Sequence, residues 1–174
     1  MKRILTAILM IALTLSFGFG QESAIATVDA TVLANLTITK NTDVDFGNIP
    51  ATGTPILDPK GASHTDVGSR ATVGVFTITG SASTQISITY PATNTLGNGT
   101  TTMTFTTDIE GHADTQASAA DVASGTQVTI GAAGSYKFWL GGNLGTLSSQ
   151  ATGTYASDNA TNGGGDFTLA IEYY

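Results

Sequence analysis

The chain of 174 residues contains no cysteine, and it has few basic residues and a single tryptophan. Without cysteine the fold cannot be cross-linked by disulfides, and a lipid anchor on an N-terminal cysteine is excluded. Six Lys and Arg stand against 13 Asp and Glu. This acidic balance argues against binding nucleic acid or anionic lipid through a basic patch. Burial of apolar side chains must therefore hold the chain together.

Catalytic motifs are also missing. The sequence has no G-x-S-x-G elbow, no phosphate-binding glycine loop and no Cys/His cluster with zinc spacing. Its two histidines, His64 and His112, are isolated in polar segments. Acidic residues near Asp43 and Asp166 could offer oxygen ligands to Ca²⁺, but turn formation and solubility account for both groups. We therefore expect a protein that is not an enzyme and has no cofactor, metal site or catalytic residue.

The first 20 residues have the layout of a cleaved signal peptide. Lys2 and Arg3 precede an apolar run over residues 4–15, and small residues follow at Gly18 and Gly20, which predicts cleavage before Gln21. The run is too short to span a membrane stably. Removal of residues 1–20 leaves four Lys and Arg against 13 Asp and Glu, a net charge of −9. We expect one exported domain over residues 21–174, without a membrane span, in the periplasm, at the outer cell surface or outside the cell.

Thr alternates with Val, Ile, Ala or Phe through most of the chain, which is typical of half-buried strands, and no window after residue 20 has a helical period. This pattern predicts an all-β, two-sheet β-sandwich of seven to eight strands. Asn98-Gly99 predicts a type I′ hairpin, and Gly131–Gly134 a four-residue loop. The strands are expected at residues 24–40, 43–49, 71–78, 85–90, 101–109, 126–130, 135–140 and 167–174.

The segment AIATVDATVLANLTI, residues 24–38, has an apolar residue at every even position. The large residues of this face are Val28, Val32, Leu36 and Ile38, and their full burial would contribute about 6–12 kcal/mol before ordering entropy. Two hypotheses stay open. The strand pairs within its own sandwich, or its first part, about residues 24–32, is a donor strand that completes a neighbouring subunit.

Two further strands carry aromatic residues of interest. In FTLAIEYY, Phe167, Leu169, Ile171 and Tyr173 share one face, so Tyr173 is expected to cap the core. In SYKFWL, Trp139 lies on the opposite face from its aromatic neighbours. An exposed Trp139 would be a candidate contact for a sugar or a partner subunit; burial in a second layer or under a loop is the alternative.

Several stretches together resemble a bacterial family of exported domains of unknown function, itself similar to chaperone–usher pilin and spore-coat-type subunits. They are LTITK, DVDFGNI, FTITGSASTQISITYP, GTY at 153–155 and FTLAIEYY. The resemblance covers residues 24–174. It implies an immunoglobulin-like or pilin-like β-sandwich in the envelope of a Gram-negative bacterium, with copies of itself, related subunits and a periplasmic chaperone as partners.

The chain departs from that family in two places. It inserts ASDNATNGGGD before the last strand, and it lacks the disulfide that many pilins have near the N-terminus. We expect a non-enzymatic structural or adhesive envelope protein, pilin-like and assembling by strand exchange. The alternative is a separate surface module that binds a glycan or a protein, with Trp139 as its contact.

Overall fold

A computed structural model describes residue 27, residues 29–157 and residues 163–174. The predicted signal peptide, residues 1–20, lies outside this described part, as do most of residues 21–28 and the centre of the ASDNATNGGGD insertion. The chain divides into the units Met1–Val32 and Leu33–Tyr174. The second unit contains every strand described below.

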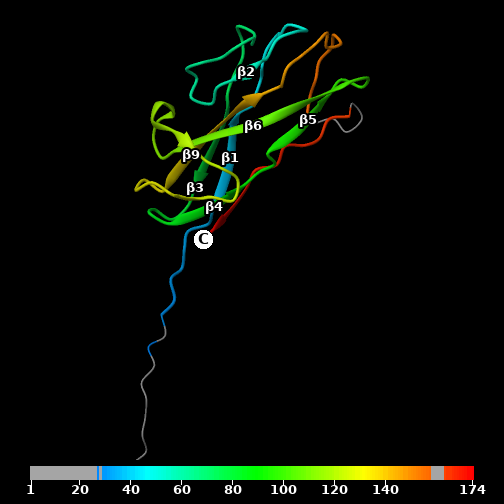
Figure 1. Ribbon diagram of the computed structural model, residues 1–174. Coiled ribbons are helices and arrows are strands. Elements are labelled where there is room, and N and C mark those ends of the chain that lie inside the picture. Colours follow the sequence, from blue (N-terminus) through cyan, green and yellow to red (C-terminus); the bar gives the residue numbers. More distant parts are fainter. Residues whose placement is uncertain (1–26, 28, 158–162) are drawn as a thin grey trace, which may run out of the picture. The chain divides into compact units, whose positions relative to one another are not determined.

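Leu33–Tyr174 is an all-β unit of two antiparallel sheets in a sandwich-like arrangement, as the sequence predicts (Figure 1). The larger sheet has seven strands in the order β1-β3-β9-β6-β5, with β2 beside β9 and β7 beside β6. Its strands are β1 (Thr37–Thr42), β2 (Ile56–Leu57), β3 (Gly74–Thr79), β5 (Thr93–Gly97), β6 (Thr102–His112), β7 (Ala120–Asp121) and β9 (Ser135–Asn143).

The smaller sheet has three strands in the order β10-β4-β8. They are β4 (Gln85–Thr89), β8 (Gln127–Thr129) and β10 (Ala170–Tyr173). Among the described residues the only helical element is the 3₁₀ turn η1 (Gln116–Ser118). No helix in that part of the chain is long and apolar enough to cross a membrane.

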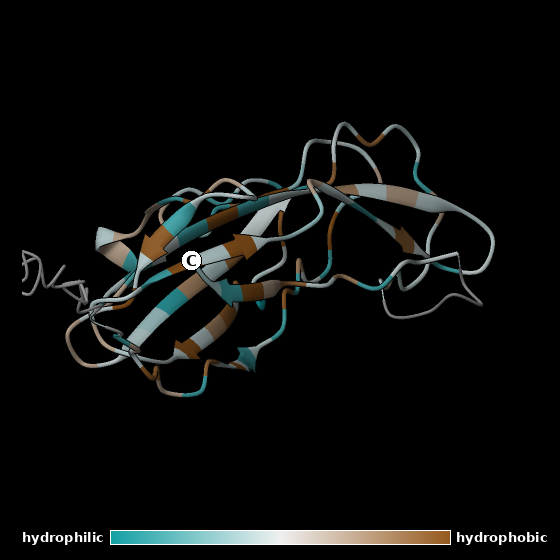
Figure 2. Ribbon diagram, turned by 90° about the horizontal axis from the view of Figure 1, so that it is seen from below, coloured by the Kyte–Doolittle hydropathy of each residue, from teal (hydrophilic) through white to brown (hydrophobic). Residues whose placement is uncertain are grey.

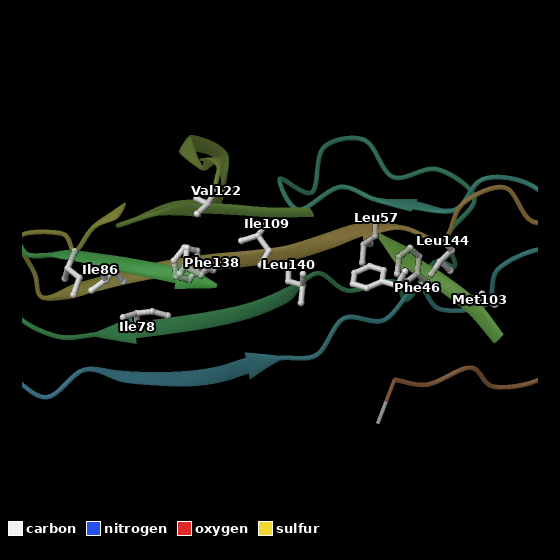
Figure 3. Close-up of a cluster of buried hydrophobic side chains, with 13 residues drawn as sticks. Phe46, Leu57, Ile78, Ile86, Met103, Ile109, Val122, Phe138, Leu140 and Leu144 are labelled. Carbon is white, nitrogen blue, oxygen red and sulfur yellow. The ribbon is translucent and has the colours of Figure 1, made fainter. Parts of the chain in front are cut away.

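The core lies on the inner face of the large sheet, where side-chain alternation gathers the apolar residues of neighbouring strands. Ile38 stands opposite Ile78, and Phe76 opposite Phe138. Apolar and polar residues alternate along the strands (Figure 2). Figure 3 shows the buried side chains extending from Ile86 and Ile78 at one end to Met103 at the other.

Most predicted strands exist, with shifted ends, but three expectations are wrong. The strand predicted at 43–49 is reduced to a single bridge between Asp45 and Thr72. The strand predicted at 24–40 begins only at Thr37 among the described residues, because Ala34 is held by side-chain hydrogen bonds and not by a neighbouring strand. Residues 93–97, which lie between the strands predicted at 85–90 and 101–109, form β5 beside β6.

The hairpin at Asn98-Gly99 is present, but its turn differs from the predicted type I′. That type requires a positive φ at both central residues, and Asn98 has none, whereas Gly99 has φ 91°. The loop instead spans residues 98–101. It is closed by the backbone bond from Asn98 N–H to the Thr101 carbonyl and by the Asn98 side-chain oxygen, which accepts from the amide of Thr100. An Asn side chain thus replaces the expected backbone geometry.

Candidate functional site

The two sheets are unequal in strand length, and this leaves part of the large sheet uncovered. Strands β6 and β9 have eleven and nine residues, whereas β4, β8 and β10 have five, three and four. The small sheet therefore covers only part of the inner face that β6 and β9 present. The uncovered part is where we place the candidate site.

A groove of about 1270 Å³ lies over this uncovered inner face. We call it the open groove. One wall is formed by residues 40–49 with the turn at 68–70, and the other by residues 153–157 and 166–167. Its floor consists of the apolar residues Phe76, Leu96, Met103, Phe105, Leu140 and Leu144. Of these, Phe76 and Leu96 are half-buried, while the other four are already buried in the domain's own core. An apolar floor between two polypeptide walls has the form of a site for an extended peptide, since alternate side chains of a strand point to one face.

A strand edge without a partner, that of β1, stands on one side of the open groove. Strand β1 ends the order of the large sheet, and β10 ends the order of the small sheet. Within the described part of the chain, each therefore has one edge with no strand beside it. Lys40 and Thr42 of β1 line the groove, as do Asp166 and Phe167, which lead into β10. Unpaired backbone N–H and C=O groups at such edges are templates for another strand.

Tyr173 joins the two edge strands at one end. Its hydroxyl accepts a hydrogen bond from the Ser81 amide at 2.7 Å and donates one to the Ala34 carbonyl at 2.8 Å. The Ala34 amide in turn donates to the Ser81 hydroxyl at 2.7 Å. A Cβ at Gly80 would lie 2.6 Å from the Tyr173 oxygen, so only glycine allows this approach. Phe167, Leu169, Ile171 and Tyr173 pack against the core, which confirms the predicted face of the last strand.

The predicted partner-strand face is divided between two environments. Leu36 packs against the core of its own domain, and Ile38 lies in β1 with 38% of its surface exposed. Val32 is 95% exposed, and Val28 lies outside the described residues. Thr27 and residues 29–36 form no strand. Self-pairing therefore holds for residues 37–42.

Not every charged side chain on the wall that contains residues 40–49 has a partner. Lys40 Nζ pairs with Asp43 at 2.5 Å, and the Asp45 carboxylate accepts the Gly47 amide at 2.7 Å. Arg70 is exposed on the same wall. Among the residues that the structure describes, it forms no ion pair. Arg70 is thus the cation of this wall that is left without a carboxylate.

Trp139 is not the exposed contact that one of the two hypotheses required. It is only 5% exposed, in the middle of β9 between Val75 of β3 and Glu110 of β6. Two loops lie close together beside this part of the sheet, since the Gln116 amide donates to the Pro59 carbonyl. The alternative of burial under a loop agrees with this position. Trp139 is therefore unavailable as a surface contact in the isolated domain.

Acidic groups gather around Glu110, which is itself buried. Its carboxylate lies 3.4 Å from Lys60 Nζ, and Glu110 stands opposite Asp121 in the register of β6 and β7. Burial raises the pKa of Glu110, with Lys60 opposing the shift and Asp108 adding to it. The pKa of Asp108 is also raised, by burial and by Asp121. Apolar cover and carboxyl repulsion here favour the protonated acids.

The two histidines have structural hydrogen bonds. His64 Nδ1 accepts the Asp58 amide at 3.1 Å, and His112 Nδ1 accepts the Asp114 amide at 3.0 Å. Each ring therefore stabilises its own loop. Within the described ranges, no group of three or more His, Cys, Asp or Glu residues could hold a metal ion.

Fold and groove together define a class: an all-β sandwich whose small sheet covers only part of the inner face of the large one, with a groove beside the free edge of β1. Residues 36–171 match the model of the family described as DUF4402, a domain of unknown function. The chain belongs to this family. The match spans the two sheets from the residue before β1 into β10. A search of curated proteins gives no match to the chain.

Proposed function

We propose that this protein is a non-enzymatic, exported structural or adhesive component of a bacterial envelope, a pilin-like subunit whose copies assemble by strand exchange. In this proposal the segment around residues 24–32 of one copy enters the open groove of the next. The observation that carries the proposal is the open groove, which has an apolar floor and the free edge of β1 on one side.

The opening segment supplies what the groove lacks. Val32 is exposed, and the even positions from Ala24 to Val32 are all apolar. A strand that alternates in this way places its apolar face on the floor and its polar residues toward water. Its backbone can hydrogen-bond to the free edge of β1, as in β-strand addition. Strand exchange would thus bury both the apolar face of the opening segment and the apolar floor of the open groove.

The energy of this contact is shared between side chains and backbone. Since Leu36 and Ile38 belong to their own domain, Val28 and Val32 are the large residues left for donation. Their burial contributes about 3–6 kcal/mol at about 1.5–3 kcal/mol each. Ordering the segment opposes this gain. Backbone pairing to the edge of β1 must therefore supply much of the stability of an assembly.

Deletion of residues 21–32 tests the proposal. The full exported chain should form multimers that resist mild denaturant, detected as multiples of the chain mass by light scattering. The deleted chain should give a folded monomer, because Leu33–Tyr174 contains all the described strands. As a matched control, Val28→Thr with Val32→Thr keeps the length and β propensity but removes apolar groups from the donated face, and it should weaken multimers without unfolding the domain.

Two results would contradict strand exchange. If the full chain remains a monomer under all these conditions, the segment has no partner groove, and a separate binding module for a glycan or protein becomes the better hypothesis. If the deletion instead unfolds the domain, residues 21–32 belong to its own core.

A further inference from the structure

The open groove has one cation without a carboxylate partner among the described residues, Arg70, and the opening segment has one charged residue, Asp29. Asp29 is the only charged residue between Ser23 and Thr39, and it is exposed. Arg70 is exposed on the groove wall and forms no ion pair within the described part of the chain. The other acids and the lysine of that wall are already engaged with one another or with the backbone, as Lys40–Asp43 and Asp45–Gly47 show.

We propose that Arg70 is the residue that sets the register of the incoming strand, by pairing with Asp29 of a second copy. This inference rests on the strand exchange proposed above and names the specificity contact of that site. The occupant of the open groove in this proposal is residues 24–32 of another copy of this chain.

Arg70 lies in the turn at 68–70, which is part of the groove wall that contains residues 40–49. Its turn is closed by the hydrogen bond from the Ala71 amide to the Gly68 carbonyl, and the Gly68 amide donates to the Phe46 carbonyl. Phe46 in turn packs edge-on against Phe105 of the floor, with ring centroids 5.9 Å apart. Arg70 therefore stands above the part of the groove where wall and floor are in direct contact.

The place of Asp29 in the alternating pattern suits a contact with Arg70 at the outer edge of the groove wall. With the even residues of the segment on the apolar floor, Asp29 is on the face that points out of the groove. It is also close to the middle of residues 24–32. A one-residue slip would turn Asp29 toward the apolar floor and bury an unpaired carboxylate, which is strongly unfavourable. A slip by two residues would keep the parity but move Asp29 along the rim, away from Arg70. The ion pair thus selects one register among those that the apolar pattern allows.

Charge exchange tests this pairing. The variants are Asp29→Lys, Arg70→Glu and the double variant, each in the full exported chain, and the readout is the initial rate of multimer growth by light scattering. Each single reversal should slow growth about three- to tenfold at low salt, since exposed pairs are weak but reversal adds repulsion. The double variant should return to within about twofold of the wild type. At 1 M salt the differences should shrink, because the Debye length falls to about 3 Å.

Two controls separate this effect from net charge and from folding. Asp114→Lys makes the same change in net charge as Asp29→Lys, but in an exposed loop away from the groove, and should leave growth unchanged. Arg70→Lys keeps the charge and should stay within about twofold of the wild type. If the single reversals match Asp114→Lys, or if the double variant is no faster than the single ones, the pairing is wrong although strand exchange stands. If the wild-type chain forms no multimers, strand exchange itself fails.

The absence of cysteine allows a direct test of the occupant. Two variants are prepared separately, and each has one thiol. Thr31→Cys places the thiol beside Asp29 on the outward face of the segment, and Ser69→Cys places it beside Arg70. Mild oxidation of the mixture should give a disulfide-linked dimer of one chain of each kind. A third chain carrying both substitutions tests the opposite case. If the mixture gives no such mixed dimer and this third chain forms its disulfide internally as a monomer, each copy fills its own groove and the assignment to a second copy is overturned.

Discussion

Substitution of Tyr173 by Phe should free the start of β1 from the last strand. The change removes a single oxygen, which accepts from the Ser81 amide and donates to the Ala34 carbonyl. The packing of the ring against the core is kept. The effect should therefore come from hydrogen bonding alone.

The magnitude depends on what happens to the two partners. The Ala34 carbonyl is exposed and can bind water, so the loss of this bond costs little. The Ser81 amide is part-buried and faces the ring, so it is left without an acceptor, and this costs about 1–2 kcal/mol. The expected loss for Tyr173→Phe is thus about 1–2 kcal/mol. For a domain of this size, that lowers Tm by roughly 3–10 °C.

Urea unfolding followed by far-UV circular dichroism measures this loss, with Tyr174→Phe as the control. Tyr174 is 76% exposed, and exposed substitutions usually change stability by less than about 0.5 kcal/mol. Amide hydrogen exchange of residues 34–38 should also speed up in Tyr173→Phe but not in Tyr174→Phe. Equal stability of the two variants would refute the reasoning, because Tyr173 would then be only a packing residue.

Two further predictions concern the other face of the large sheet. Because burial raises the pKa of Glu110, its protonated form contributes stability that is present below about pH 4 and is lost as pH rises through the folded pKa. Glu110→Gln should therefore reduce the difference between urea midpoints at pH 4 and pH 7, while the exposed Glu172→Gln should not; an equal reduction in both would contradict the cause. Trp139, the single tryptophan, should emit at short wavelength and resist acrylamide quenching, whereas strong quenching would place it at the surface.

The alternation of apolar and polar residues predicted the class of the fold and the inward faces of most strands. It identified the face of Phe167, Leu169, Ile171 and Tyr173, because a period of two belongs to any strand with one buried side. It failed at residues 93–97, TNTLG, where four of the five residues are polar or glycine. There the pairing with β6 decides the conformation, and that partner is not contained in the local pattern.

The open groove was not predictable from the local sequence for a related reason. Its floor residues, such as Phe76 and Leu140, have the same pattern as residues under the small sheet, such as Ile78 and Phe138. Alternation says that a side chain faces inward. It does not say whether a second layer covers it, because that depends on the lengths of strands far away in the sequence.

The opening segment shows how one sequence pattern can serve two purposes. From Ala24 to Ile38 the apolar parity continues without interruption, yet the hydrogen bonds of Ala34 to Ser81 and Tyr173 mark where attachment to the domain begins. After this point the parity fits the domain's own core, through Leu36 and the pairing of Ile38 with Ile78. Before it, Val32 continues the same parity without burial. In the proposed assembly, the residues before Ala34 lie on the inner face of the neighbouring subunit, and the residues after it lie on the inner face of their own domain. Because identical subunits have equivalent inner faces, one uninterrupted apolar parity fits both.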